Sequence, residues 1–539
     1  MRNISFTLGF VLLLLLVCGA AGWLAMPVRA SQKIAVTEDA RWFSADTGAG
    51  LVYTIRRENG DMVSCRFHGT ELNSQVKHSQ VGMGLGKAEV SCRLASSGTV
   101  MILTAVTDTL THYYISRAGE NTIYMATYIK AEPAVGELRY IFRGNGKVLT
   151  QVPAPSNNGG STGLVEHTEI HRHADGTTSS KYYGNTAAKD LTLGGDTGDG
   201  VGVFMAYGSR EKSSGGPFYR DIQFQSGGNA EIYNYMNSGH AQTEPVRLGL
   251  HGPYALLFTA GEVPAVPDFS WLAGLDLRGW VSERGSVAVA KITGMDARYP
   301  YTVGFANGDA QYWTAAADGA AVCRDMIPGV YTMTVYKGEL EVYSQSVAVT
   351  AGETTAIAAC EIAADPSRVP AIWRIGDWDG TPREFLNGAN LSLMHPSDGR
   401  NADFAVGTFD VGSPAGDFPA LQFRQVNSPL RIRFSLTAAQ AAQTHRLKIG
   451  ITVAYNGGRP AVLVNGRELP KLPPSVQPKS RSLTVGTYRG NNHTFVWEIP
   501  AADFVAGENE LVITPLSGNQ DLDPWLSAAW AYDCLELDA

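Results

Sequence analysis

The stretch Glu137-Leu-Arg-Tyr-Ile-Phe-Arg143 places an apolar side chain at every second position. Successive side chains of a β-strand point to opposite faces, so this stretch would turn its Leu, Tyr and Phe to one face and both arginines to the other. Short runs of this kind recur between Gly, Asn and Asp turns, among them Leu51–Arg56, Thr122–Ile129 and Leu447–Val453. Few stretches have a helical period. The pattern therefore predicts an all-β protein built of sandwiches.

The chain of 539 residues is too long for a single hydrophobic core. Composition divides it into three parts after an N-terminal segment. Residues 31–274 carry the densest polar and aromatic motifs, and residues 275–362 have the size of a small sandwich of about seven strands. Residues 363–539 are rich in Trp, Asn and Gly. We expect three consecutive β domains with these boundaries.

The N-terminus has the layout of a secretory signal peptide. Arg2 precedes an apolar run from Phe10 to about Met26, and the small-residue ending Val28-Arg-Ala30 follows. We expect cleavage after Ala30, which removes residues 1–30. A retained membrane anchor is the alternative, because the run is long for a signal peptide. The mature protein is expected to be secreted, extracellular, free of the membrane and monomeric.

The charge of the chain limits its partners. The formal net charge is −8, and cleavage removes two arginines and no acid, so that −8 − 2 gives −10 for the mature chain. An acidic protein is a poor partner for nucleic acid. If the substrate is an acidic polymer, the positive charge that binds it must be local to a cleft.

Cysteine usage fits an oxidising compartment. The cysteines close in sequence suggest two local disulfides, Cys65–Cys92 and Cys323–Cys360, with Cys534 left over.

Two arginines on one strand face suggest contact with an anionic chain. Arg139 and Arg143 would stand about 13 Å apart along the strand, at 3.3 Å per residue. That spacing suits successive sugar units, and a guanidinium binds a carboxylate through two parallel hydrogen bonds. The alternative is a solvated outer face, which is the more common position of strand arginines.

A second cluster of polar and aromatic residues lies in the stretch from Glu231 to Glu244. Tyr233 and Tyr235 share one strand face and would form a platform for sugar rings. The turn Asn237-Ser-Gly239 then presents His240. Two shorter motifs, Ser179–Tyr183 with its single Lys181 and the charged glycine turn Glu211–Asp221, could equally be a surface lysine and a plain hairpin connection.

Several of these segments resemble those of rhamnogalacturonan endolyases of polysaccharide lyase family 4. The similar segments are Ala131-Glu-Pro-Ala-Val-Gly-Glu-Leu-Arg139, Lys212-Ser-Ser-Gly-Gly-Pro-Phe-Tyr-Arg-Asp221, Tyr235-Met-Asn-Ser-Gly-His-Ala-Gln-Thr-Glu244, Leu250-His-Gly-Pro-Tyr254 and Trp373-Arg-Ile-Gly-Asp-Trp-Asp-Gly-Thr-Pro382. The resemblance covers nearly the whole mature chain and is weakest over residues 280–362. It implies a large β-sandwich catalytic domain, a fibronectin type III-like sandwich and a C-terminal jelly roll like a carbohydrate-binding module.

The resemblance also implies an activity and a site. Such an enzyme cleaves rhamnose-(1→4)-galacturonate bonds by β-elimination and leaves an unsaturated galacturonate end. The lysine base and the histidine acid fall on Lys181 and His240, with Lys212 as a second candidate for the base. Substrate contacts are expected from five residues: Arg139, Arg143, Tyr233, Tyr235 and Glu244.

Three other functions compete with this interpretation. A glycoside hydrolase would need two carboxylates about 5 to 10 Å apart across a cleft, and the sequence marks out no such pair. A metal enzyme could use His171 and His173 with Asp175, but no further ligand is obvious. A glycan-binding protein without catalysis could stack sugars on Trp373, Trp378 or Trp525, although tryptophans in a core are the usual case.

No cofactor is expected for catalysis, because a uronate carboxylate itself acidifies the proton that elimination removes. A structural Ca²⁺ ion is conceivable at the Asp-rich turns Asp196–Gly200 and Asp521–Asp523, but nothing else in the sequence supports it.

Overall fold

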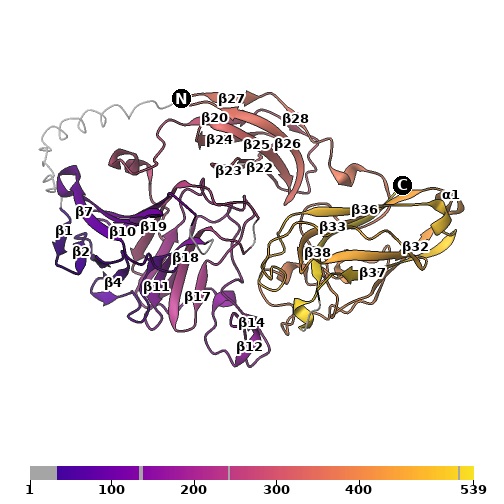
Figure 1. The fold of residues 1–539 in the computed structure, drawn as a ribbon, viewed down its shortest axis with the longest axis horizontal. Helices are drawn as coiled ribbons and strands as arrows, with labels where there is room; N and C mark the ends of the chain where they lie inside the picture. Colours follow the sequence, from indigo (N-terminus) through magenta and orange to yellow (C-terminus); the bar gives the residue numbers. More distant parts are fainter. Residues whose placement is uncertain (1–32, 133–136, 241–242, 520–522) are drawn as a thin grey trace, which may run out of the picture.

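The computed structural model describes residues 33–132, 137–240, 243–519 and 523–539 (Figure 1). Within these ranges the regular structure is nearly all β-strand, and the single α-helix, α1 (Ala438–Ala441), is one turn long. The prediction of an all-β protein is confirmed. The predicted signal peptide lies outside the described residues. Within the described ranges, the model contains no helix with the length and apolar character that a bilayer crossing needs.

The N-terminal part, β1–β19, contains four sheets. A seven-stranded antiparallel sheet has the order β15 (Leu193–Gly198), β16 (Val201–Ala206), β19 (Gly249–Thr259), β10 (Thr122–Ile129), β9 (Leu110–Arg117), β8 (Val100–Val106) and β7 (Glu89–Ala95). A four-stranded sheet has the order β17 (Phe224–Ser226), β18 (Asn229–Asn237), β11 (Leu138–Asn145) and β6 (Gln80–Val81). A five-stranded sheet contains β1 (Ala35–Glu38), β2 (Trp42–Asp46), β3 (Leu51–Arg56), β4 (Met62–Phe67) and β5 (Thr70–Glu71). A small sheet contains β12 (Gly163–Glu166), β13 (Ile170–Arg172) and β14 (Thr178–Ser179).

Strand β11 has the alternation that the sequence predicts. Leu138, Tyr140 and Phe142 are at most 1% exposed and join the main core of the N-terminal part. Strands of the five-, seven- and four-stranded sheets all contribute to that core, so β11 buries one face against the sandwich interior. The other face of β11 carries both arginines, and it is available to build a site.

The middle part, β20–β28, is a small sandwich, and the C-terminal part, β29–β38, is a larger one. The middle part pairs β24 (Ala321–Met326), β20 (Gly285–Val289) and β27 (Thr354–Ile357) in one sheet; β23 (Gln311–Ala315), β22 (Tyr301–Ala306), β25 (Gly329–Lys337) and β26 (Leu340–Val349) in another; and β21 (Ile292–Thr293) with β28 (Cys360–Glu361). The C-terminal part pairs β29 (Ala371–Gly376), β38 (Ala529–Asp538), β33 (His445–Tyr455) and β36 (His493–Ile499), with β31 (Leu421–Phe423) also on β38. Its second sheet has β30 (Thr408–Asp410), β32 (Leu430–Leu436), β37 (Gly507–Leu516), β34 (Arg459–Val464) and β35 (Arg467–Glu468).

The small sheet β12–β14 lies where the N-terminal part meets the C-terminal part (Figure 1). There the Asp398 carboxylate of the C-terminal part accepts hydrogen bonds from the backbone N–H of Thr178, at 2.5 Å, and from its hydroxyl, at 2.7 Å. Asp398 Oδ1 in turn forms an ion pair with Arg400, at 2.8 Å. The first and last parts of the chain are therefore in direct polar contact.

The predicted disulfides are wrong in this structure. All five cysteines that the structure describes are free thiols: Cys65, Cys92, Cys323, Cys360 and Cys534. The members of each predicted pair belong to strands of different sheets, β4 and β7 in one case and β24 and β28 in the other. Burial raises the pKa of the Cys65 and Cys323 thiols, which keeps them protonated.

Candidate active site

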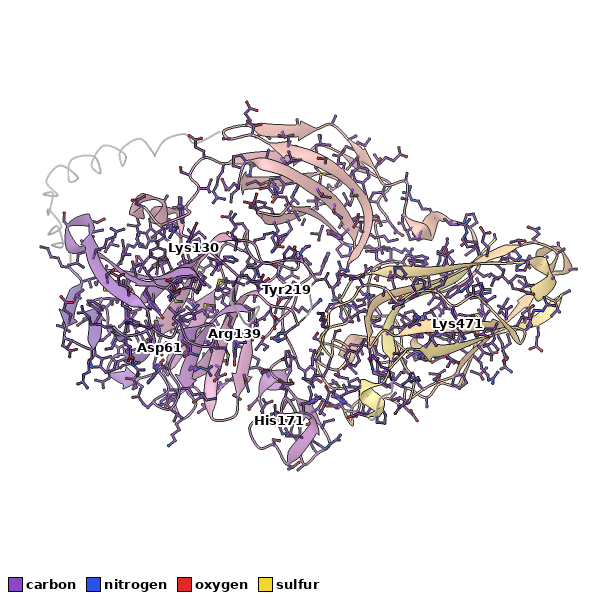
Figure 2. All side chains as sticks on the ribbon, viewed as in Figure 1. Asp61, Lys130, Arg139, His171, Tyr219 and Lys471 are labelled. Carbon is purple, nitrogen blue, oxygen red and sulfur yellow. The ribbon has the colours of Figure 1, made fainter. Side chains whose placement is uncertain are left out.

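The outer face of β11 and β18 gathers the predicted binding residues. The register of the two antiparallel strands places Arg139 opposite Tyr235 and Arg143 opposite Glu231. Arg139 donates to the Tyr235 hydroxyl and to Glu137, and Arg143 forms an ion pair with Glu231. Figure 2 labels Arg139 on this sheet. Both guanidiniums are therefore fixed on one face by acidic or phenolic partners.

The two tyrosines of β18 are not an open platform. The rings of Tyr233 and Tyr235 stack at 5.8 Å, but these residues are only 5% and 3% exposed. Ile222 and Tyr182 pack over them together with Ile141. The Arg139 guanidinium lies over the Tyr235 ring, 5.1 Å from its centre, and a direct contact of these rings with sugars stays a prediction.

His240 follows β18 and is held between two carboxylates. Its Nδ1 lies 2.9 Å from Asp221 Oδ1, and its Nε2 lies 3.3 Å from Glu137 Oε1. Burial disfavours the charged imidazolium, but the two carboxylates outweigh it and raise the pKa of His240 to about 10. The ring is therefore protonated at neutral pH, as a general acid must be.

Asp221 is the functional residue that the sequence interpretation missed. Its side chain is only 2% exposed, and it accepts hydrogen bonds from the Tyr219 hydroxyl at 2.5 Å and from the backbone N–H of Ile222 at 2.7 Å. Burial raises its pKa, but the His240 ring and these donors more than offset that and lower it. Asp221 thus stays ionised and fixes the orientation of the imidazole. The only sequence feature that could have indicated Asp221 was its place in Tyr219-Arg-Asp221, at the end of the Glu211–Asp221 motif.

Lys181 lies after β14 in a turn beside the same face. Its Nζ is 5.4 Å from the centre of the Tyr182 ring and 4.0 Å from Glu169 Oε1. Burial lowers the pKa of Lys181, and the Arg139 guanidinium lowers it further, against the opposing effect of Glu169. This is the direction that a lysine base requires.

The structure brings Lys181 and His240 to the same place. The Tyr182 ring meets the His240 ring edge-on at 5.5 Å. The Glu137 carboxylate raises the pKa of both Lys181 and His240. The candidate base, the candidate acid and Arg139 therefore share Glu137, just before β11, as a neighbouring charge.

Two other predicted residues have different surroundings. Lys212 Nζ donates to the backbone carbonyl of Asp309 in the middle part, at 2.8 Å. Glu244 accepts from the backbone N–H of Gly215 and pairs with Arg247 at 2.7 Å. The structure gives neither residue a contact with Arg139, Lys181 or His240 among the interactions of the described residues.

A loop of the C-terminal part forms a wall of the site, which the sequence did not indicate. Arg481 forms ion pairs with Glu166 and with Glu169, the same carboxylate that lies near Lys181. The Ser480 hydroxyl donates to the backbone carbonyl of His240. The segment between β35 and β36 therefore contacts the neighbours of both candidate catalytic residues.

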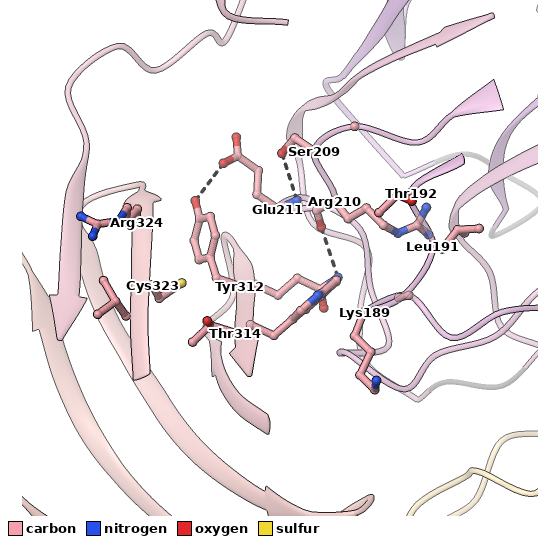
Figure 3. A pocket seen from close by; sticks show the side chains of 15 residues that line it. Lys189, Leu191, Thr192, Ser209, Arg210, Glu211, Tyr312, Thr314, Cys323 and Arg324 are labelled. Carbon is pink, nitrogen blue, oxygen red and sulfur yellow. Dashed lines mark hydrogen bonds between the residues drawn. The ribbon is translucent and has the colours of Figure 1, made fainter. Parts of the chain in front are cut away.

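Two cavities among the described residues differ in size and place. A small one adjoins the candidate site, and a larger one lies apart from it. A cavity of about 10 Å³, the size of one water molecule, is lined by Tyr182, Arg220, Asp221 and His240 with Val485 to Thr487. A pocket of about 460 Å³ lies between the N-terminal and middle parts (Figure 3). Glu211 and Tyr312 meet there at 2.9 Å, and neither Lys181 nor His240 lines it.

The residues considered for a metal have different surroundings. His171 and His173 contact Ser161 and Ser179, at 3.1 and 2.8 Å. Asp196 is fully buried in β15, where burial raises the pKa of its carboxyl well above the usual range. Asp521 lies outside the described residues. Within the described ranges, no three His, Cys, Asp or Glu side chains are grouped as a metal site would require.

Comparison with known proteins gives matches that together cover most of the chain. Family models match in order: the N-terminal domain of rhamnogalacturonan lyase B over residues 34–279, and domains II and III of polysaccharide lyase family 4 over residues 283–357 and 371–537. The chain is 40% identical over 515 residues to a probable rhamnogalacturonate lyase A of Aspergillus fumigatus, covering 94% of this chain and 95% of that protein. It is 38% identical over 514 residues to rhamnogalacturonate lyase A of Aspergillus aculeatus, covering 93% and 95%.

These matches, with the fold and the site, define the class of the protein as a polysaccharide lyase. The chain belongs to polysaccharide lyase family 4, and its three β parts correspond in order to the three matched domains of that family.

Proposed function

We propose that the protein is a secreted endolyase that cleaves the rhamnose-(1→4)-galacturonate bond of rhamnogalacturonan I by β-elimination. The observation that carries the proposal is the placement of a lysine with a lowered pKa and a protonated histidine on one arginine-bearing face. Elimination needs these groups: a neutral base for the C5 proton, an acid for the leaving O4 and a cation for the uronate carboxylate.

The step balances with the residues present. Lys181 Nζ takes the proton from C5 of galacturonate, and the electrons of that C–H bond form the C4–C5 double bond. The C4–O4 bond breaks, and His240 Nε2 gives its proton to O4 of the departing chain. Arg139 pairs with the carboxylate and stabilises the negative charge that develops on it. The products are an unsaturated galacturonate end and a new chain end with a free sugar hydroxyl.

Glu137 pairs with the two groups that the substrate would use. Its carboxylate bridges Arg139 and His240 Nε2, which are the two groups that the uronate and O4 would contact. A bound substrate would therefore displace Glu137 from both, and the carboxylate of the substrate would replace that of Glu137 beside the guanidinium. This exchange substitutes one anion for another beside Arg139.

The reaction product tests the activity directly. We expect the purified protein to release products with a conjugated, ultraviolet-absorbing end from rhamnogalacturonan, in the absence of added metal and after treatment with a chelator. The conjugation arises because elimination creates a double bond beside the carboxylate. Products that carry new reducing ends without ultraviolet absorbance would mean hydrolysis, and activity lost on chelation and restored by a metal ion would disprove the metal-free step.

Arg139→Ala is expected to reduce kcat/KM by about 10²- to 10³-fold, the usual loss when one fixed charge-stabilising donor is removed. The guanidinium is the group that neutralises the uronate, and its loss also leaves Glu137 to compete for His240. Steady-state kinetics on the polymer measures the effect. Arg433→Ala, which breaks an exposed pair with Asp410 in the C-terminal part, is the matched control and should leave kcat/KM unchanged. Unchanged kinetics in Arg139→Ala would remove that residue from the site.

Export and the monomeric state belong to the same proposal. Export is supported by the signal-peptide pattern of residues 1–30, and the substrate is an extracellular polymer. The mature protein is expected to appear in the culture medium with an N-terminus at Ser31.

A further inference from the structure

The hairpin β25–β26 of the middle part ends in a turn that reaches the other two parts of the chain. Glu339 in this turn has a side chain only 6% exposed. The backbone N–H groups of Glu339 and Leu340 donate to the carbonyl of Asp379 in the C-terminal part, at 2.6 and 3.0 Å. The turn is therefore fixed to the C-terminal part by its backbone, which leaves its carboxylate to bind side chains.

The Glu339 carboxylate binds one side chain from each neighbouring part. Oε1 lies 3.1 Å from Arg220 Nη2 of the N-terminal part and 3.0 Å from the Tyr488 hydroxyl of the C-terminal part. Arg220 and Tyr488 also contact each other, at 3.1 Å. Arg489 approaches Oε2 at 3.7 Å. One buried carboxylate thus neutralises cations from two domains at the point where all three meet.

Arg220 connects this junction to the acid of the active site. It immediately precedes Asp221, the carboxylate that orients His240 through Nδ1. The side chains of Arg220, Asp221 and His240 line the same water-sized cavity. Because Arg220 is held at its tip by Glu339 and at its Nη1 by the carbonyl of Phe218, at 3.2 Å, the short segment that carries Asp221 has little freedom to move.

We propose that Glu339 of the middle part is a positioning residue for His240, acting through Arg220 and Asp221, so that the active site is complete only when all three parts are assembled. The inference rests on the proposed role of His240 as the acid. Without the Glu339 charge, the nearly buried Arg220 guanidinium would lack an anionic partner. We expect it to shift toward the neighbouring Asp221 carboxylate and so weaken the contact between Asp221 and His240.

The test measures the pKa of His240 by NMR of ¹³C-labelled histidine, with the His240 signal assigned from its absence in His240→Gln. Among the described residues, the titratable groups in contact with the ring are Asp221, Glu137, Tyr182 and Tyr235. In Glu339→Gln we expect the pKa of His240 to fall by about one unit, because a weakened Asp221 contact disfavours the imidazolium. The alkaline limb of the kcat profile should move by the same amount, and kcat should fall by about tenfold with KM nearly unchanged.

Three further variants make the result decisive. Tyr488→Phe removes one contact of the same junction without burying a lone charge and should lower the pKa of His240 in the same direction by less. Asp221→Asn sets the maximal fall. Asp365→Asn breaks the buried pair with Lys337 in the same middle part, at 2.7 Å, and should cost stability without moving the pKa.

The proposal would be overturned if Glu339→Gln folded and kept the wild-type pKa of His240. It would also be overturned if the pKa fell no further than it does in Asp365→Asn. Because the NMR titration does not use turnover, it gives this answer even if His240 proves not to be the acid.

Discussion

Lys181→Ala is expected to lower kcat by about 10³-fold, within the 10²- to 10⁴-fold range of a positioned general base, while the affinity for the polymer changes little. The structure gives the physical reason, since burial and Arg139 lower the pKa of this amine and so increase its neutral fraction. The initial rate of ultraviolet absorbance measures kcat. Calorimetric binding of a rhamnogalacturonan oligosaccharide measures affinity.

Two other lysines provide the controls. Lys189→Ala removes an exposed lysine that pairs with its neighbour Asp190 and should behave as wild type. Lys212→Ala tests the second candidate base and should also keep most of its activity, because its amine donates to a carbonyl of the middle part. A nearly active Lys181→Ala beside an inactive Lys212→Ala would transfer the role of base to Lys212.

His240→Gln is expected to lower kcat by about 10²- to 10⁴-fold at neutral pH, because the leaving O4 loses its proton donor. In the wild-type protein the pKa of His240 is raised to about 10, so the acid is protonated below that pH and kcat should fall as pH rises through about 10. On the acidic side kcat should rise with pH as Lys181 loses its proton, below the usual lysine value. The pH profile of kcat checks both limbs.

The same raised pKa makes a prediction about stability with a fixed sign. The unfolded histidine has a pKa of 6.5, so the folded state gains stability from His240 fully below that value and loses it as pH rises through about 10. The protonated ring and its two carboxylates should therefore stop contributing to stability in alkaline solution.

A wild-type profile of kcat against pH with no alkaline limb would contradict the role of His240 as the acid. A His240→Gln enzyme with normal kcat would contradict it as well.

The sequence predicted the local part of this architecture well. The alternation around Tyr140 is enough to tell the core face of β11 from its arginine face, because burial follows the two-residue period of a strand. The roles of Lys181 as base and His240 as acid were predicted from the family resemblance. The domain boundaries at residues 274 and 362 stay predictions.

The rest depends on contacts between segments far apart in the chain. Asp221 and His240 meet only because the segment before β17 folds back beside the end of β18. Arg481 approaches Glu169 across 312 residues of sequence, which no local pattern encodes. The cysteine pairs were likewise predicted from closeness in sequence alone, and the thiols are free in the structure. The tyrosine platform was predicted from one strand, whereas Tyr182 from another segment covers it.

The ion pairs of Arg481 bear on how such an enzyme can be engineered. The C-terminal part resembles a detachable sugar-binding module, yet its loop shields the acidic neighbour of Lys181 and touches the backbone of His240. Exchanging that module for one with another specificity would remove the Arg481 ion pair from Glu169 and the Ser480 contact from His240. In a chimaera, the loop between β35 and β36 and the N-terminal sandwich should therefore come from the same parent protein.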